Sequence, residues 1–140
     1  MKRFILFGIV LALLGASFIF SQEESNPYSY TFNKKKMSGD AFYKDKTYDE
    51  VWAALVKVLM VDYKILESDK DSGIMAAFLK DKKNDRYDML VEKREGGVGI
   101  FINAVEHDIL GVYSKRYKQI CQKVAVNLYG EEVIPKKKKK

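Results

Sequence analysis

The sequence contains very little cysteine, histidine or proline. Its 140 residues include one cysteine, one histidine and two prolines. A single cysteine, Cys121, excludes a disulfide within the chain. Zinc sites take three or four nitrogen, sulfur or oxygen ligands, so His107 with its neighbours Glu106 and Asp108 does not predict a metal centre. No serine or cysteine can be placed beside His107 by spacing, so a catalytic triad is not predicted either.

The body of the chain carries almost no net charge. The formal net charge is +6, but seven of the 25 basic residues lie at the two ends, in Lys2, Arg3 and Lys136–Lys140. Between Gln22 and Pro135, the remaining 18 basic residues face 19 acidic ones. A nearly neutral body does not favour nucleic-acid binding, which requires a basic face.

The C-terminal lysines are the candidate binding residues of the sequence: Lys136, Lys137, Lys138, Lys139 and Lys140. They predict weak contact with an anionic surface such as lipid head groups, with about 1 kcal/mol per lysine close to a charged membrane. Physiological salt screens this attraction. A solvated tail without a partner is the alternative interpretation.

A long hydrophobic run occurs only at the N-terminus. Phe4–Phe20 has no ionisable side chain, follows Lys2 and Arg3, and gives way to a polar segment at Gln22. This pattern is typical of a secretory signal peptide. We expect residues 1–21 to be removed before Gln22, with an uncleaved membrane anchor as the alternative. The sequence therefore predicts an exported protein of the bacterial periplasm or cell envelope, with residues 22–27 as a polar leader.

Residues 28–135 predict one α+β domain. Apolar and polar residues alternate in several segments, which indicates strands at 28–32, 63–67, 74–79, 86–93 and 98–105, with 37–43 left open as a further short piece. Polar turns are expected at 68–73, 80–85 and 95–97. We expect an antiparallel sheet of about four to five strands in the order strand, helix, four strands, helix. Two amphipathic helices should pack on one face of this sheet.

The two predicted helices have clear signals. Thr47 can cap a helix that ends near Asp62, and Glu50 stands three residues later to close a capping box. Apolar residues repeat at helical spacing over 108–129, which predicts the second helix. Cys121 lies on the apolar stripe of this helix, so we expect a buried thiol without chemical reactivity.

Two short motifs resemble ligand-binding loops. The acidic segment Asp69–Gly73 has a glycine at the fifth position and Lys80 at the twelfth, where a calcium-binding EF-hand needs glycine at the sixth and glutamate at the twelfth. Turn chemistry of aspartate explains its acidic residues. Gly96–Gly99 lies between two predicted strands, whereas a phosphate loop opens a helix, so a hairpin turn is favoured.

The segments Tyr48–Leu59 and Tyr63–Phe78 combine a capped helix, a strand, an acidic turn and a second strand. Together they resemble the helix-plus-hairpin unit of the BamC-like envelope domains, which are helix-grip modules of accessory lipoproteins in outer-membrane β-barrel assembly and of other exported proteins. The chain departs from these lipoproteins because Ser17 stands where the lipid-accepting cysteine would be. The resemblance implies a non-catalytic protein-interaction module and assigns no site residues.

Three hypotheses for function follow. The first is an exported, non-catalytic accessory module without a cofactor, whose partner is another envelope protein. The second is a carrier of a small apolar ligand, bound in a cleft between the sheet and the C-terminal helix. The third, a hydrolase that uses His107 with Glu106 or Asp108, has the least support, and we expect the protein not to be an enzyme.

Overall fold

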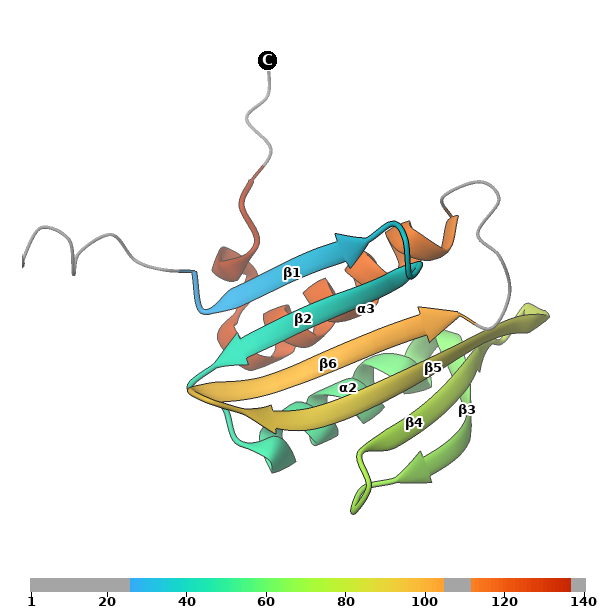
Figure 1. The fold of residues 1–140 in the computed structure, drawn as a ribbon, viewed down its shortest axis with the longest axis horizontal. Helices are drawn as coiled ribbons and strands as arrows, with labels where there is room; N and C mark the ends of the chain where they lie inside the picture. Colours follow the sequence, from blue (N-terminus) through green and yellow to red (C-terminus); the bar gives the residue numbers. More distant parts are fainter. Residues whose placement is uncertain (1–25, 105–111, 137–140) are drawn as a thin grey trace, which may run out of the picture.

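The structure, a computed structural model, describes residues 26–104 and 112–136. It contains a six-stranded antiparallel sheet with two α-helices on one face (Figure 1), which confirms the predicted α+β class. The elements follow one another as β1 (Tyr28–Asn33), β2 (Ser38–Lys44), α2 (Tyr48–Asp62), β3 (Tyr63–Asp69), β4 (Ile74–Leu79), β5 (Lys82–Arg94), β6 (Gly97–Ala104), α3 (Val112–Tyr129) and the short 3-10 helix η1 (Glu131–Val133).

The strands lie in the order β1-β2-β6-β5-β4-β3. The four strands β3 to β6 form the predicted antiparallel meander. The β1–β2 hairpin joins the sheet through β2, which pairs with β6. Because β2 and β3 lie far apart in the sheet, α2 carries the chain across one face to connect them (Figure 1). The two edges of the sheet are therefore β1 and β3.

The predicted strand count of about four to five was too low, because β2 is a full strand of seven residues. Its segment Ser38–Asp40 is small and polar and has a weak strand pattern. The structure requires a small residue there, since a Cβ atom at Gly39 would lie 2.8 Å from the hydroxyl oxygen of Tyr30 and 3.2 Å from the Cβ of Tyr117. Close packing of neighbouring elements, and not local propensity, explains this strand.

Two predicted boundaries also need correction or restriction. The expected polar turn over 80–85 is shorter, because β5 begins at Lys82 and the register shifts so that Leu79 pairs with Lys82. The second helix is observed from Val112 to Tyr129, while the predicted residues 108–111 lie outside the described part. The chain leaves this helix at Gly130, whose φ of 93° is readily adopted only by glycine.

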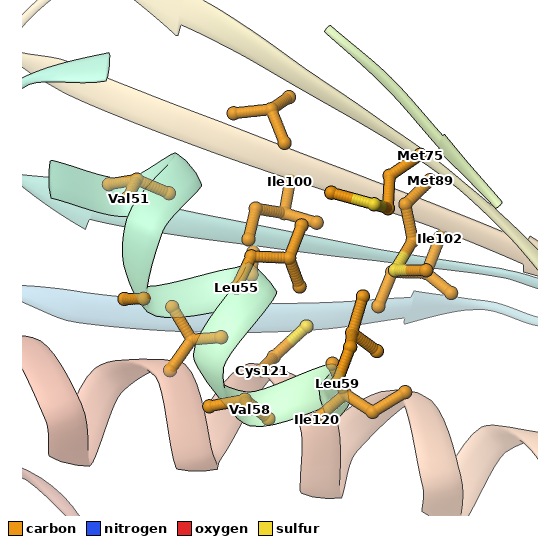
Figure 2. Packing of buried hydrophobic residues seen from close by; sticks show 14 of the residues in the cluster. Val51, Leu55, Val58, Leu59, Met75, Met89, Ile100, Ile102, Ile120 and Cys121 are labelled. Atoms are coloured by element: carbon orange, nitrogen blue, oxygen red, sulfur yellow. The ribbon is translucent and has the colours of Figure 1, made fainter. Parts of the chain in front are cut away.

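The core lies between the sheet and the helices. The predicted capping box is present: Glu50 N donates to Thr47 Oγ1 at 3.3 Å, and Thr47 N donates to Glu50 Oε2 at 2.8 Å. The helix that starts there buries Leu55 completely, beside Ile100 of β6 (Figure 2). Burying one such side chain contributes about 1.5–3 kcal/mol. Within residues 26–104 and 112–136, no helix is long and apolar enough to span a membrane.

Candidate functional site: the uncovered face of the sheet

The two faces of the sheet differ in what covers them. Side chains alternate along a strand, and in β5 Tyr87, Met89 and Val91 are buried against the helices as predicted. The residues between them, such as Leu90, point to the opposite face. Both helices lie on one side of the sheet (Figure 1), and no described element covers the other side. We refer to that other side as the open face.

An apolar row crosses the middle of the open face. Ile74 of β4 pairs with Leu90 of β5, and Leu90 pairs with Phe101 of β6. Ile74 is 42% exposed, Leu90 is 37% exposed, and Phe101 is half-buried. Neighbouring strands lie about 4.8 Å apart, so the three side chains are in contact range. A contiguous exposed apolar row of this kind is a candidate interaction surface.

The sequence analysis did not identify this row. The outward positions of β5 include Arg86, Asp88, Leu90, Glu92 and Arg94, of which only Leu90 is apolar. An apolar residue in a run of outward charged residues was the available signal. This signal could be interpreted only once the strand register was known, because the apolar neighbours of Leu90 lie on adjacent strands and not beside it in the sequence.

Arg94 forms one border of the row. Its guanidinium group contacts Asp40 Oδ1 at 2.8 Å and Glu92 Oε1 at 2.7 Å. To reach Asp40 on β2, the side chain crosses β6 above Gly99, where a Cβ atom would overlap the guanidinium carbon. Burial alone would lower the pKa of Arg94, but its hydrogen bonds to Glu92 and Asp40 raise it overall. Gly99 therefore provides the space for an ion pair across three strands.

The opposite border also carries charges of both signs. Arg86 Nε donates to Asp88 Oδ1 at 2.9 Å, and the ammonium group of Lys64 lies 5.9 Å from the centre of the Phe78 ring. The open face thus has an apolar centre and a rim of paired charges. Protein–protein interfaces have this arrangement, with charged residues depleted at the centre and polar groups at the rim.

A separate cavity of about 290 Å³ lies between the end of α2, α3 and the β4–β5 turn. Charged side chains and apolar or aromatic side chains contribute equally to its lining. Lys80 Nζ donates to the carbonyl oxygens of Met60 and Val61 at 3.0 and 2.9 Å, and Lys123 Nζ donates to Asp62 at 3.1 Å. This lining does not match the apolar cleft expected between the sheet and the final helix, so carriage of an apolar ligand stays a prediction.

Arg116 lies at the same cavity and joins α3 to β5. Its Nη1 donates to Asp85 Oδ2 at 2.6 Å and to the hydroxyl oxygen of Tyr87 at 2.9 Å. Burial alone would lower the pKa of Arg116, but these hydrogen bonds outweigh that effect and raise it. The guanidinium group therefore remains charged and holds the helix against the sheet. The sequence analysis did not single out this residue.

The lone thiol is part of the core, as predicted. Cys121 is fully buried, and burial raises its pKa to about 12. The hydroxyl of Tyr43 donates to the carbonyl oxygen of Cys121 at 3.0 Å. The hydroxyls of Tyr28 and Tyr30 are buried without a hydrogen-bond partner within the described part of the chain, and burial raises their pKa values. At neutral pH this cluster stays protonated and offers no nucleophile.

Most of the predicted site residues fall outside the described part. This holds for His107 with its two acidic neighbours, for Lys137–Lys140 and for residues 1–21, whereas Lys136 is described and exposed. The acidic turn has the predicted aspartate chemistry, because Asp69 Oδ1 accepts hydrogen bonds from the backbone N–H groups of Asp71 and Ser72. In residues 26–104 and 112–136, no group of three or more His, Cys, Asp or Glu side chains could hold a metal ion.

No protein-family model matches the chain, and no curated protein is significantly similar to it. The resemblance to BamC-like domains stays a prediction, and the functional argument depends on the geometry of the open face.

Proposed function

We propose that this protein is an exported, non-catalytic module that binds another protein of the bacterial envelope through the open face of its sheet. The row formed by Ile74, Leu90 and Phe101 carries this proposal. These side chains lie on three adjacent strands and remain partly exposed to water. Covering them with a complementary apolar surface would remove that exposed area and favour association.

The charges around the row favour a protein over a polyanion as the partner. Arg94 is paired with Asp40 and Glu92, and Arg86 is paired with Asp88. Because these cations already have carboxylate partners, the open face presents no continuous positive potential for nucleic acid or an anionic membrane. A protein surface with an apolar centre and mixed charges at its rim is complementary to it.

Export is the other part of the proposal, and it is supported by the sequence of residues 1–21. The test is N-terminal sequencing of the protein recovered from the cell envelope. A chain that begins at Gln22 supports a cleaved signal peptide, and a chain that begins at Met1 supports the uncleaved anchor. Recovery of the protein only from the cytoplasm would contradict export.

Partner binding is tested by crosslinking in the host cell, followed by affinity capture from envelope fractions. The variants Ile74→Asp and Leu90→Asp each place a charge within the apolar row. Met60→Asp is the matched control, because Met60 is 64% exposed but lies on α2 rather than on the open face. We expect wild type and Met60→Asp to recover the same crosslinked protein, and the two open-face variants to lose it.

Circular dichroism and thermal unfolding of the variants show whether the fold is intact. If the folded open-face variants capture the same protein as the wild type, the open face is not the binding surface. If the wild type captures no protein under crosslinking, the proposed function is wrong.

A further inference from the structure

The free edge of β1 exposes unpaired backbone groups. Lys44 N donates to the carbonyl oxygen of Pro27 at 2.8 Å, and hydrogen-bonded pairs alternate along an antiparallel ladder. In the β1–β2 register, this directs the backbone groups of Tyr30 and Phe32 away from β2. The N–H of Tyr28 is already bound by Asn26 Oδ1 at 3.1 Å. Within the described part of the chain, the outward N–H groups of Tyr30 and Phe32 have no partner.

This edge is regular, whereas the edge at β3 is not. The β1–β2 register is continuous from Tyr28 to Asn33. On the other side of the sheet, the β3–β4 register shifts between Ile65 and Glu67, which places a bulge in the edge strand. A bulge interrupts the row of hydrogen-bonding groups and protects an edge from further pairing. Of the two edge strands in the described part of the chain, β1 is the one that offers an unbroken template for an added strand.

The two ends of the β1 edge differ in charge. Lys34, Lys35 and Lys36 follow the strand directly and are exposed. At the other end, Asn26 Nδ2 donates to the carbonyl oxygen of Val133 at 3.4 Å, which brings the C-terminal segment beside the start of β1 (Figure 1). That segment continues to the exposed Lys136. The same segment also carries the exposed Glu131 and Glu132, so the excess of positive charge along this edge lies at the end formed by Lys34–Lys36.

On the covered face of the sheet, the β1 edge also presents partly exposed aromatic side chains. Tyr30 and Phe32 are only half-buried. The ring of Phe32 lies 6.3 Å from the ring of Tyr117 on α3, so the helix stands beside the edge. Alternate side chains of an added strand would extend the covered face of the sheet there and pack on these aromatic rings.

We propose that the β1 edge binds an extended acidic segment of a partner protein as an additional strand. The backbone of Tyr30 and Phe32 supplies the hydrogen bonds, and Lys34, Lys35 and Lys36 select for acidic residues. This inference does not depend on the open face.

The test uses the purified full-length protein and a synthetic peptide with the sequence Glu-Glu-Val-Thr-Val-Thr-Glu-Glu. Hydrogen exchange should show new protection of the Tyr30 and Phe32 amides when the peptide is present. The amides of Ser29 and Thr31 already pair with β2 and should change little. We expect the triple variant Lys34→Glu, Lys35→Glu, Lys36→Glu to bind the peptide at least about tenfold more weakly, which corresponds to about 1.4 kcal/mol.

Two N-methylated peptides separate strand pairing from simple charge attraction. Methyl groups on one alternate set of amides block the peptide edge that faces β1 and should abolish binding. Methyl groups on the other set face solvent and should leave binding unchanged. Equal binding of both methylated peptides would show attraction without strand pairing and would overturn the proposal, as would unchanged exchange at Tyr30 and Phe32. Leu90→Asp should leave peptide binding intact, which separates this result from the test of the open face.

Discussion

The two faces of one sheet place similar residues in different surroundings. On the covered face, Ile100 is completely buried beneath Leu55 of α2. On the open face, Ile74 and Leu90 follow the same strand alternation but keep 42% and 37% of their surface exposed. The difference arises because both helices pack on one side. Apolar residues on the covered face stabilise the fold, while those on the open face remain partly exposed to water.

The largest expected effect is a difference between the two faces in how much a substitution lowers the free energy of unfolding. Leu55→Ala removes a fully buried side chain and should lower the free energy of unfolding by about 2–5 kcal/mol. Leu90→Ala is the matched substitution on the open face and should cost less than about 1 kcal/mol, because the side chain is partly exposed. Urea denaturation of both variants measures the difference. Equal losses would show that the open face is covered in the free protein.

The next effect concerns a polar contact within the covered face. Tyr43→Phe removes the hydroxyl that donates to the carbonyl oxygen of Cys121 and leaves that oxygen buried. We expect a loss of about 1–2 kcal/mol in the free energy of unfolding. Tyr48→Phe provides a control, since the Tyr48 hydroxyl donates to the carbonyl of Lys70 at the surface. A larger loss of unfolding free energy for Tyr48→Phe than for Tyr43→Phe would show that burial does not strengthen the contribution of the Tyr43 hydrogen bond.

A smaller effect, dependent on pH, is expected at the start of α2. The backbone N–H and then the hydroxyl of Thr47 bind the Glu50 carboxylate and hold its pKa below the usual value of 4.5. A lowered pKa in the folded state stabilises the protein above the unfolded pKa, and this stabilisation is lost as the pH falls through the folded pKa. Glu50→Ala should therefore be less stable than wild type at pH 7.

Thermal unfolding from pH 7 down to pH 3 follows this difference, which should shrink on acidification below pH 4.5. Glu131→Ala, an exposed acidic residue of η1, serves as the control. A difference that stays constant with pH would show that the carboxylate of Glu50 does not stabilise the cap.

The smallest effect tests the ion pair on the open face. Gly99→Ala should displace the Arg94 guanidinium and separate it from Asp40, at a cost below about 1 kcal/mol because the pair is partly exposed. In an Arg94→Ala background the clash is absent, and alanine should be neutral or stabilising in a strand. A double-mutant cycle on unfolding free energies measures this coupling. Additive effects would contradict the proposed role of Gly99.

Local signals in the sequence predicted several elements correctly. Thr47 and Glu50 marked the start of α2 because a capping box depends on residues three positions apart. The alternation in β5 predicted that Tyr87 and Val91 would share the covered face, and the position of Cys121 on an apolar stripe predicted a buried thiol. Each of these features depends on neighbours within a few residues along the chain.

Features that depend on distant segments were missed. The strand β2 was left open because Gly39 has little strand propensity, and its small size makes sense only beside Tyr30 and Tyr117. The open-face row needed the register of β4, β5 and β6, which sequence patterns do not specify. The contact of Arg94 with Asp40 joins residues on β5 and β2, and no spacing in the sequence brings them together.

The sequence by itself determined which residues alternate, where α2 begins, where both helices end, and that an α+β fold with an antiparallel meander would form. Periodicity and capping are short-range properties, so they can be recognised from local sequence. Only the tertiary structure decided which face the helices cover, which apolar residues remain exposed, and which strand edge stays free. These outcomes depend on the order of strands in the sheet, and that order is set by packing among segments far apart in the chain.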